Sequence, residues 1–468
     1  MHDFGPLMKG LVIGSLGILH VFLAQFAIGG GFLICLLQRR AMQGKSPLAR
    51  EFIQKFFSVL VLVSFVLGAV TGVAMWFTTI QISPRTIGVM VHEFHWIWAI
   101  EWTFFSLEVT SGYLFYKYSS RLDDRSALTL AGLYALAAWS SLFWINGILS
   151  WQLTPGGWLD GHNVWSGFFN ASFWPSLLFR TITALTIAGL SACILVNAIP
   201  GYSREDRESL VHDCSSLLAP MAAMPLLGLW YFAVIPADSR EWVMGGSMPM
   251  TMFLNLAVVF SGLIGGYALV GLIRQKLFIN GATATLLLAL AFMATGAGEF
   301  VREGVRKPFS IREYLYANSV RVDEVAYLRR EGSVTHDPYP VAEPKGGFPT
   351  DQLRHGAGVF RFQCSVCHTV DGTNGLLPLV QTWSNTQLRL NISQLQRTKP
   401  FMPPFAGNAK DVEALVQWIN WNRSDAPPKW GISQDAAILE EIQGYLDEAG
   451  VVPGSNDPTD AQVAEVRS

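Results

Sequence analysis

Charged residues are scarce in this sequence, since Asp, Glu, Lys and Arg make up only 15% of its 468 residues, against about 25% in a typical soluble domain. Positive charge is not in excess either: the formal net charge is −2, which gives no reason to expect nucleic-acid binding, a function that requires a basic surface. Cysteine is also rare, and two of the five cysteines fall in one short motif, so a disulfide framework is excluded. An ordinary cytosolic enzyme is therefore close to excluded.

Apolar residues are abundant instead, at 51% of the sequence with 30 Phe and 16 Trp, and they are concentrated in the first three hundred positions. A transmembrane helix needs about 20 mostly apolar residues. We therefore predict an all-α fold: a polytopic membrane bundle of about eight helices, followed by a small helical domain. The first helix follows no cleavable signal pattern and is interpreted as a retained span. The eight predicted spans are Leu7–Leu37, Phe56–Ile80, Phe94–Tyr118, Leu128–Leu149, Phe173–Ala198, Leu217–Ile235, Met250–Ile273 and Ala282–Phe300.

The loops between the predicted spans differ in their content of Lys and Arg. The first, third, fifth and seventh loops together hold twelve of these residues, whereas the N-terminus and the alternate loops hold only Lys9, Arg85 and Arg240. Because cytoplasmic loops collect Lys and Arg, both termini are predicted to lie outside the cytoplasm. With eight spans, everything after residue 300 is then extracytoplasmic.

The composition changes after residue 300, and we divide the chain into four predicted parts. We expect the membrane domain at 1–300, a Pro- and charge-rich connector at 301–350, a compact domain at 351–425 and a C-terminal tail at 426–468. The compact domain should begin with a short amphipathic helix and end with a second one. The tail contains an acidic helix-like stretch and then becomes too polar to bury a core, so disorder is expected there.

A Cys-x-x-Cys-His motif lies at Cys364, Cys367 and His368, and this spacing is the signature of covalent heme c attachment. Two thiols three residues apart can each bond one vinyl group of a porphyrin, and the next residue then places an imidazole on the iron. Met402 follows in a Pro-rich turn and is the expected sixth ligand, a combination that raises the potential of the iron. With its flanking helices, this region resembles a class I cytochrome c domain. The alternatives are a chance match, a zinc site or a redox-active cysteine pair.

Ionisable residues also occur within the predicted spans, where they are costly and therefore candidates for function. His20 lies in the outer half of the first span and is either a packing histidine or an axial heme ligand. Glu101 and Glu108 are seven residues apart on one face of the third span, which suits a proton path or a ligand of ferric heme; the alternative is a hydrated packing defect. His95, at the outer mouth of that span, is a further candidate heme ligand. Arg180, near the outer start of the fifth span, could contact a heme propionate or extend to the membrane surface.

The eighth span ends in a run of opposite charges at the outer surface. This run includes Glu303, a candidate ligand of iron, and Arg306, a candidate partner of a cofactor. Taken alone, the same charges could form only a collar of ion pairs.

Together these residues resemble subunit I of the cytochrome bd oxygen reductases over most of the first 310 positions. His20 corresponds to the first-span histidine that ligates the active-site heme of that family. Glu101 and Glu108 correspond to a third-span pair, a heme-proximal glutamate and a proton-path acid, although the family spacing is one residue longer. The segment 303–309 is similar to the family's Glu-x-Gly-Arg-Gln-Pro-Trp, whose Glu ligates a high-spin heme b.

The sequence departs from this family at the low-spin heme b and at the quinol site. The family's fifth span supplies a histidine, with a Met of the seventh span opposite, whereas the aligned position here is Arg180 or Phe179. The family's long quinol-binding loop is replaced by a short turn at 236–249. The family's ninth span is replaced by the connector and the cytochrome c domain, which could supply electrons in place of quinol.

The resemblance implies a respiratory protein of the bacterial inner membrane, with its cytochrome c domain in the periplasm. It implies heme c on that domain, and heme b, alone or with heme d, in the membrane domain. In the leading interpretation, a periplasmic electron donor reduces heme c, and membrane hemes reduce O2, in a complex with a second membrane subunit and membrane lipid. In the alternative, the chain only conducts electrons within a larger redox complex. We expect no nucleic-acid partner.

Overall fold

The computed structural model describes residues 5–46, 48–274, 279–334 and 339–450. The predicted disorder at the end of the tail lies outside the described residues. The chain divides into two compact units that differ in character. The membrane unit comprises Ser15–Trp76 and Met90–Val305, and the soluble unit comprises Met1–Gly14, Phe77–Val89 and Arg306–Ser468.

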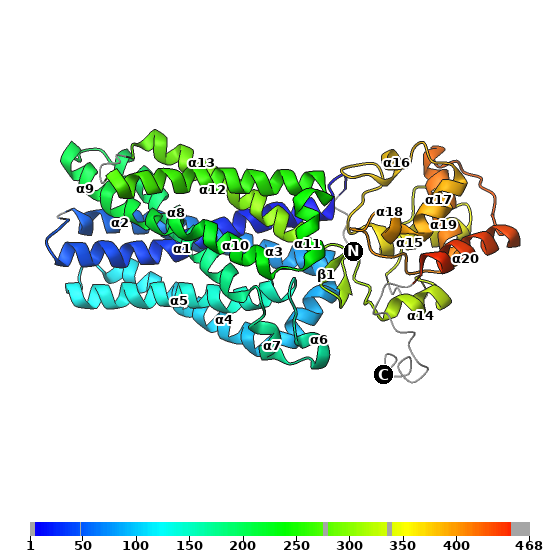
Figure 1. The fold of residues 1–468 in the computed structure, drawn as a ribbon, viewed down its shortest axis with the longest axis horizontal. Coiled ribbons are helices and arrows are strands. Elements are labelled where there is room, and N and C mark those ends of the chain that lie inside the picture. The colour runs from blue at the N-terminus through cyan, green and yellow to red at the C-terminus, as the bar shows by residue number, and fades with distance from the viewer. Residues whose placement is uncertain (1–4, 47, 275–278, 335–338, 451–468) are drawn as a thin grey trace. The chain divides into compact units, whose positions relative to one another are not determined.

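The membrane unit consists of long helices that run side by side (Figure 1). A π-helical segment, Val61–Gly68, joins α2 to α3, and a 3-10 segment, Ser216–Ala223, joins α9 to α10. The long helices are α1 (Lys9–Met42), α2 (Ala49–Leu60), α3 (Ala69–Ile82), α4 (Pro84–Tyr118), α5 (Asp124–Trp151), α8 (Phe173–Ala198), α9 (Arg204–Ser215), α10 (Met224–Val234), α12 (Met248–Arg274) and α13 (Gly281–Gly304). The short helices between them are α6 (Trp158–Gly161), α7 (Val164–Phe168) and α11 (Ala237–Glu241). The predicted all-α polytopic bundle is confirmed.

Seven of these helical segments are long and apolar enough to cross a membrane. The predicted third span, Phe94–Tyr118, is not among them, because it lies in α4, a helix of 35 residues that contains several ionisable side chains and has a kink at Phe94. The start of α1, the turn between α3 and α4, and the chain after α13 all belong to the soluble unit. The assignment of Phe94–Tyr118 as an eighth span stays a prediction.

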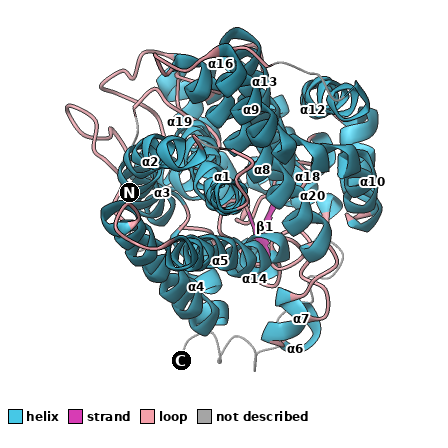
Figure 2. Ribbon diagram, turned by 90° about the vertical axis from the view of Figure 1, so that its left-hand side faces the viewer, coloured by secondary structure: helices cyan, strands magenta, loops and turns pink. Residues whose placement is uncertain are grey.

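Helix α1 packs closely against its neighbours because it contains three consecutive glycines. In the end-on view of Figure 2, α1 lies between α2, α5 and α8. A Cβ atom on Gly29 would lie 2.8 Å from the Cβ of Ala188 in α8, and one on Gly31 would lie 2.9 Å from the Cα of Ala135 in α5. Such small residues let helix backbones approach one another in a membrane. Helix α1, which contains His20, is therefore held within the bundle.

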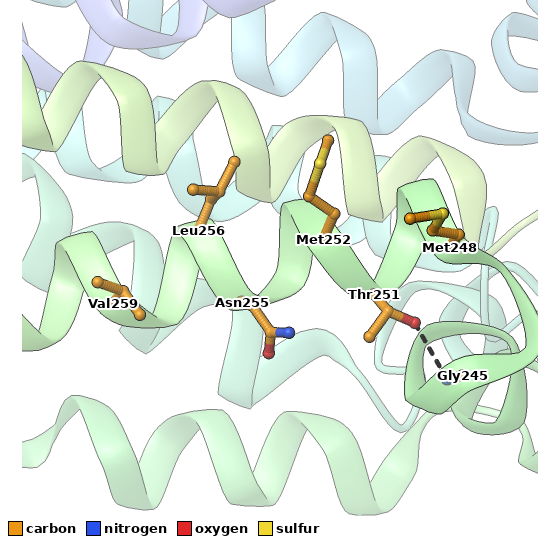
Figure 3. Close-up of a pocket in the computed structure, with 7 residues that line it drawn as sticks. All are labelled: Gly245, Met248, Thr251, Met252, Asn255, Leu256 and Val259. Carbon is orange, nitrogen blue, oxygen red and sulfur yellow. Dashed lines mark hydrogen bonds between the residues drawn. The ribbon is translucent and has the colours of Figure 1, made fainter.

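Helix α12 presents a largely apolar groove (Figure 3). Met248 is 86% exposed, and Thr251 accepts a hydrogen bond from the backbone N–H of Gly245 at 3.0 Å. Exposed apolar side chains of this kind suit a helix surface that faces lipid tails. The groove is lined by Gly245, Met248, Thr251, Met252, Asn255, Leu256 and Val259.

The soluble unit is built around two crossed helices, α15 (Asp351–Val359) and α19 (Ala409–Arg423). A Cβ atom on Gly356 would lie 2.7 Å from the Cβ of Trp418, so only glycine permits this crossing. The ring of Phe360 stacks on that of Trp418 with centroids 4.7 Å apart. Three further short helices, α16 (Leu376–Leu379), α17 (Asn385–Ser393) and α18 (Leu395–Thr398), complete the fold around this crossing.

Segments outside the predicted compact domain also contribute to this unit. Helix α20 (Ala436–Ala449), within the predicted tail, places Ile442 and Leu446 in the core formed with α19. Within the predicted connector, β1 (Phe309–Ile311) and β2 (Leu315–Tyr316) form an antiparallel pair that is followed by α14 (Glu324–Glu331). These elements share a smaller apolar cluster with the buried Ala406.

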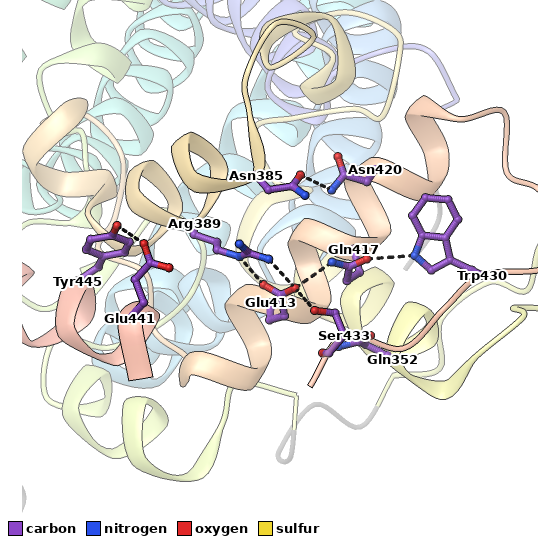
Figure 4. Close-up of polar contacts among 10 residues, drawn as sticks. All are labelled: Gln352, Asn385, Arg389, Glu413, Gln417, Asn420, Trp430, Ser433, Glu441 and Tyr445. Atoms are coloured by element: carbon purple, nitrogen blue, oxygen red, sulfur yellow. Dashed lines mark hydrogen bonds and ion pairs between the residues drawn. The ribbon is translucent and has the colours of Figure 1, made fainter. Parts of the chain in front are cut away.

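A buried ion pair fastens α17 to α19 (Figure 4). Arg389 donates to both carboxylate oxygens of Glu413, at 2.7 and 3.0 Å, and the Glu413 side chain is only 1% exposed. Burial alone would raise the pKa of Glu413, but hydrogen bonds from Arg389, Ser433 and Gln417 outweigh it and hold the pKa below its ordinary value. Ser433 is fixed in turn by backbone hydrogen bonds to Gln352. The network therefore ties the segment before α20 to α15 and α19.

Replacing Arg389 with Met is expected to destabilise the soluble unit by about 3–5 kcal/mol, because Glu413 would keep its buried charge without its cation. Since the folded pKa of Glu413 is low, its stabilisation is present above the ordinary glutamate pKa of about 4.3 and is lost as the pH falls through the folded pKa. The measurement is amide hydrogen exchange of α19 in the full chain. The control is Arg397→Met, whose exposed pair with Glu448 should contribute under about 1 kcal/mol; equal effects would contradict the prediction.

Candidate heme sites

The Cys-x-x-Cys-His motif begins at the last residue of a π-helical turn, Phe360–Cys364, that extends α15. The carbonyl of Cys364 accepts from the backbone N–H groups of Cys367 and His368, at 3.1 and 2.9 Å. This single turn holds the two cysteines and the histidine next to one another. Burial, and then the nearby Cys367, raise the pKa of the half-buried Cys364 thiol to about 12, so the group is neutral.

His368 has the hydrogen bonding of an axial ligand. Its Nδ1 lies 3.0 Å from the carbonyl oxygen of Asn374, and Asn374 in turn donates to the carbonyl of Cys367 at 2.8 Å. Because a carbonyl only accepts, Nδ1 carries the proton and Nε2 keeps the lone pair that binds a metal. Burial lowers the pKa of His368, which keeps the imidazole neutral. These features fit a heme iron.

The geometry does not favour zinc at this motif. Within the described part of the chain, no three His, Cys, Asp or Glu side chains are grouped so that they could hold a metal ion. A zinc site would need Cys364, Cys367, His368 and a fourth group around one point. Heme c attachment requires only one of these residues, His368, to reach the metal.

Met402 lies on a turn that is tied to the motif. Gln363, directly before Cys364, donates to the carbonyl of Ala406 at 2.6 Å, and the backbone N–H of Met402 donates to Lys399 at 2.8 Å. Phe405, which is fully buried, anchors the turn in the core. The half-buried Met402 is therefore presented from a turn whose position is fixed relative to the attachment motif.

In the membrane unit, His20 is oriented by the end of the π-helical segment. Its Nδ1 lies 3.2 Å from the carbonyl of Gly68 and 3.2 Å from the hydroxyl of Thr71. π-Helical segments are frequent at functional sites. A Cβ atom on Gly72 would lie 2.9 Å from Cε1 of His20, so the ring also needs glycine opposite it. As with His368, a carbonyl fixes Nδ1 and leaves Nε2 for a metal.

Glu101 and Glu108 both lie on α4, but in different surroundings. Glu101 accepts a hydrogen bond of 2.5 Å from the hydroxyl of Ser141 in α5. Glu108 is 8% exposed and lies two turns further along, about 10 Å at 1.5 Å per residue. The two acids therefore lie one after the other along α4. Among the described residues, only Glu101 accepts a hydrogen bond from a hydroxyl of α5.

The other predicted site residues are dispersed. Arg180 lies 3.4 Å from Glu299, which also accepts from Arg302 at 2.7 Å. The first of these contacts joins α8 to α13. Glu303 is exposed at the end of α13 and belongs to the membrane unit. Arg306 is buried in the soluble unit, where it donates to the carbonyl of Ser310 at 3.2 Å.

His95 is exposed on α4, and its Nδ1 lies 3.1 Å from the carbonyl of His92 in the preceding turn. This hydrogen bond lies within one helix. Of the two candidate ligand histidines, His20 and His95, His20 is the one that is hydrogen bonded to another helical segment.

The supporting residues were missed by the sequence analysis. Asn374, Gln363, Thr71 and Ser141 act through hydrogen bonds to residues far away or across a loop, which sequence spacing does not reveal. No local signal marked Thr71 either, because Ser58, Ser64, Thr78 and Thr79 also lie within the same predicted span.

Comparisons with known proteins identify two families and one fold to which the chain is similar. Residues 12–237 match the family model of cytochrome bd terminal oxidase subunit I, and residues 351–419 match that of cytochrome C oxidase, cbb3-type, subunit III. The fold is similar to a chain of the bd oxidase from Geobacillus thermodenitrificans, with a TM-score of 0.58 and 14% identity. That match covers 67% of this chain and 90% of the other. No curated protein matches the chain. Both resemblances predicted from the motifs are confirmed.

Proposed function

We propose that this heme-containing membrane protein of respiratory electron transfer is a cytochrome c-linked oxygen reductase subunit. The proposal starts from its two parts, a cytochrome bd subunit I domain and a cytochrome c domain. The chain accepts electrons from a periplasmic donor at heme c and delivers them to membrane heme for the reduction of O2. The arrangement of His368, with Nδ1 bonded to a backbone carbonyl so that Nε2 keeps the lone pair that can bind a metal, supports this proposal. The matching arrangement of His20 extends it into the membrane.

Heme, when bound, supplies one-electron transfer and, where a coordination position is open, the chemistry of O2. In the soluble unit, Cys364 and Cys367 would hold heme c covalently, with His368 and Met402 as ligands. In the membrane unit, His20 and Glu303 would hold heme b, or heme b and heme d. Arg306 stays a predicted cofactor-binding residue.

Proton supply would fall to the two acids of α4. Glu108 is buried away from solvent, and Glu101 is hydrogen bonded to Ser141. A carboxyl group can take up a proton at one oxygen and release it from the other, so successive acids can pass protons along a helix. We assign Glu108 to proton delivery and Glu101 to proton delivery or heme ligation.

The proposed location is the inner membrane of a bacterium, with the soluble unit in the periplasm. The loop charges support this orientation. A second membrane subunit is the expected partner, by similarity to the bd oxidases.

Glu108→Gln is expected to slow O2 consumption driven by reduced cytochrome c by roughly 100-fold, the typical contribution of positioned proton transfer. Heme content should be unchanged, because Gln has the size of Glu and forms hydrogen bonds. The rate is measured with an oxygen electrode. Glu205→Gln, an exposed position on α9, is the control; a wild-type rate in Glu108→Gln would refute the assignment.

A second function is favoured by the contact between Arg180 and Glu299. Arg180 or Phe179 aligns with the histidine that binds the low-spin heme b in the cytochrome bd family. In the structure, Arg180 is paired with the carboxylate of Glu299. A chain that lacks this heme could conduct electrons to another subunit without reducing O2. Oxygen uptake with reduced cytochrome c separates the two functions. Uptake that falls in Glu303→Ala supports an oxygen reductase, and the absence of uptake despite reducible membrane heme supports conduction.

A further inference from the structure

The first residues of the chain pack against the loop that follows the heme attachment motif. The carbonyl of Pro6 accepts from both the backbone N–H and the hydroxyl of Thr373, at 2.8 and 2.7 Å. The approach is so close that a Cβ atom on Gly372 would lie 2.6 Å from the Cα of Pro6. All these residues belong to the soluble unit.

One turn further on, Lys9 reaches the motif itself. Its ammonium group donates to the hydroxyl of Ser365 at 3.0 Å, and that hydroxyl donates to the carbonyl of Arg361 at 2.7 Å. Ser365 directly follows Cys364 and is the first of the two residues between the cysteines of the Cys-x-x-Cys-His motif. Lys9 is only 7% exposed. A positive charge is therefore held, largely shielded from water, beside the site where heme c would be attached.

A fixed charge in this position affects the two redox states differently. Oxidised heme iron carries one more positive charge than reduced iron, so a nearby cation disfavours oxidation. The Coulomb energy is larger for a buried charge than for an exposed one, because less water screens it. The expected result is a higher reduction potential of heme c.

We propose that the N-terminal segment Gly5–Lys9 forms part of the heme c pocket and that Lys9 raises the reduction potential of heme c. Lys9 is a positioning residue in this role, since its ammonium group acts from beside Ser365. The inference rests on the proposed attachment of heme c at Cys364 and Cys367. The start of the first membrane helix thus tunes the group that receives electrons from the donor.

The test is a redox titration of the heme c absorbance in the purified full chain. Lys9→Gln should shift the midpoint potential to a lower value. Lys9→Arg keeps the positive charge and should keep the potential of the parent protein. Lys429→Gln makes the same change of charge at an exposed position of the same unit and should leave the potential unchanged. Gly372→Val should displace Pro6, lower the potential and increase amide hydrogen exchange at the start of α1.

The outcomes separate this inference from the proposed function. A parent protein without covalent heme would refute the proposed function, and the inference with it. A parent protein with heme c, and a Lys9→Gln variant of equal potential, would refute only the inference. Unchanged hydrogen exchange in Gly372→Val would also contradict the packing of the N-terminal segment against the loop.

Discussion

Replacing Cys364 and Cys367 together with Ser is expected to abolish covalent heme and to reduce O2 consumption from reduced cytochrome c to background. Serine hydroxyls do not form thioether bonds with heme vinyl groups, and in the proposed function heme c is the group that accepts the donor's electrons. Peroxidase staining of a denaturing gel measures covalent heme, and an oxygen electrode measures the rate. Membrane heme should remain, because its candidate ligands lie in the other unit.

Cys35→Ser is the matched control, since Cys35 is a half-buried cysteine outside the motif. It should keep the heme stain and the rate. Full oxygen uptake in the double variant would show that electrons enter the membrane heme by another route. That result would remove the soluble unit from the proposed pathway, even if the parent protein carries heme c.

His20→Ala is expected to remove non-covalent heme from the membrane unit and, with it, oxygen consumption, while heme c remains. The imidazole is held by Gly68 and Thr71. The methyl group of alanine cannot replace the axial nitrogen that is lost. Because Ala also leaves a cavity, a modest loss of stability is expected as well. The measurement is the spectrum of extracted non-covalent heme, compared with covalent heme in the same sample.

Two histidines serve as controls for this variant. His212→Ala changes an exposed residue of α9 and should leave all heme in place. His95→Ala tests the competing ligand: its ring is exposed and bonded within its own helix, so heme retention is expected. Loss of membrane heme in His95→Ala but not in His20→Ala would reverse our assignment.

Much of this architecture was predictable because membrane helices follow from local composition. Among the described residues, seven of the eight predicted spans satisfy length and apolarity, and α4 is the exception because it contains several ionisable side chains, including the candidates Glu101 and Glu108. The motif at Cys364 was predictable for a similar reason, since covalent attachment requires a fixed local spacing. What the sequence could not reveal was long-range. The contact of Lys9 with Ser365 joins residues 356 positions apart, and no periodicity reports it.

Arg180 illustrates the same limit. Alignment with the family identified the position, but the choice between a cofactor contact and an ion pair depends on which side chain α13 presents. In the structure that side chain is Glu299. The exposed Glu303, four residues later, then remains the candidate ligand on that helix.

The most direct measurement is a pyridine hemochrome spectrum of the purified full chain, taken before and after acid–acetone extraction. The account predicts two populations: heme c, which stays with the polypeptide, and at least one b- or d-type heme, which is extracted. Only the first population in a folded sample would contradict the account, because the membrane unit would then have no redox centre to receive the electrons.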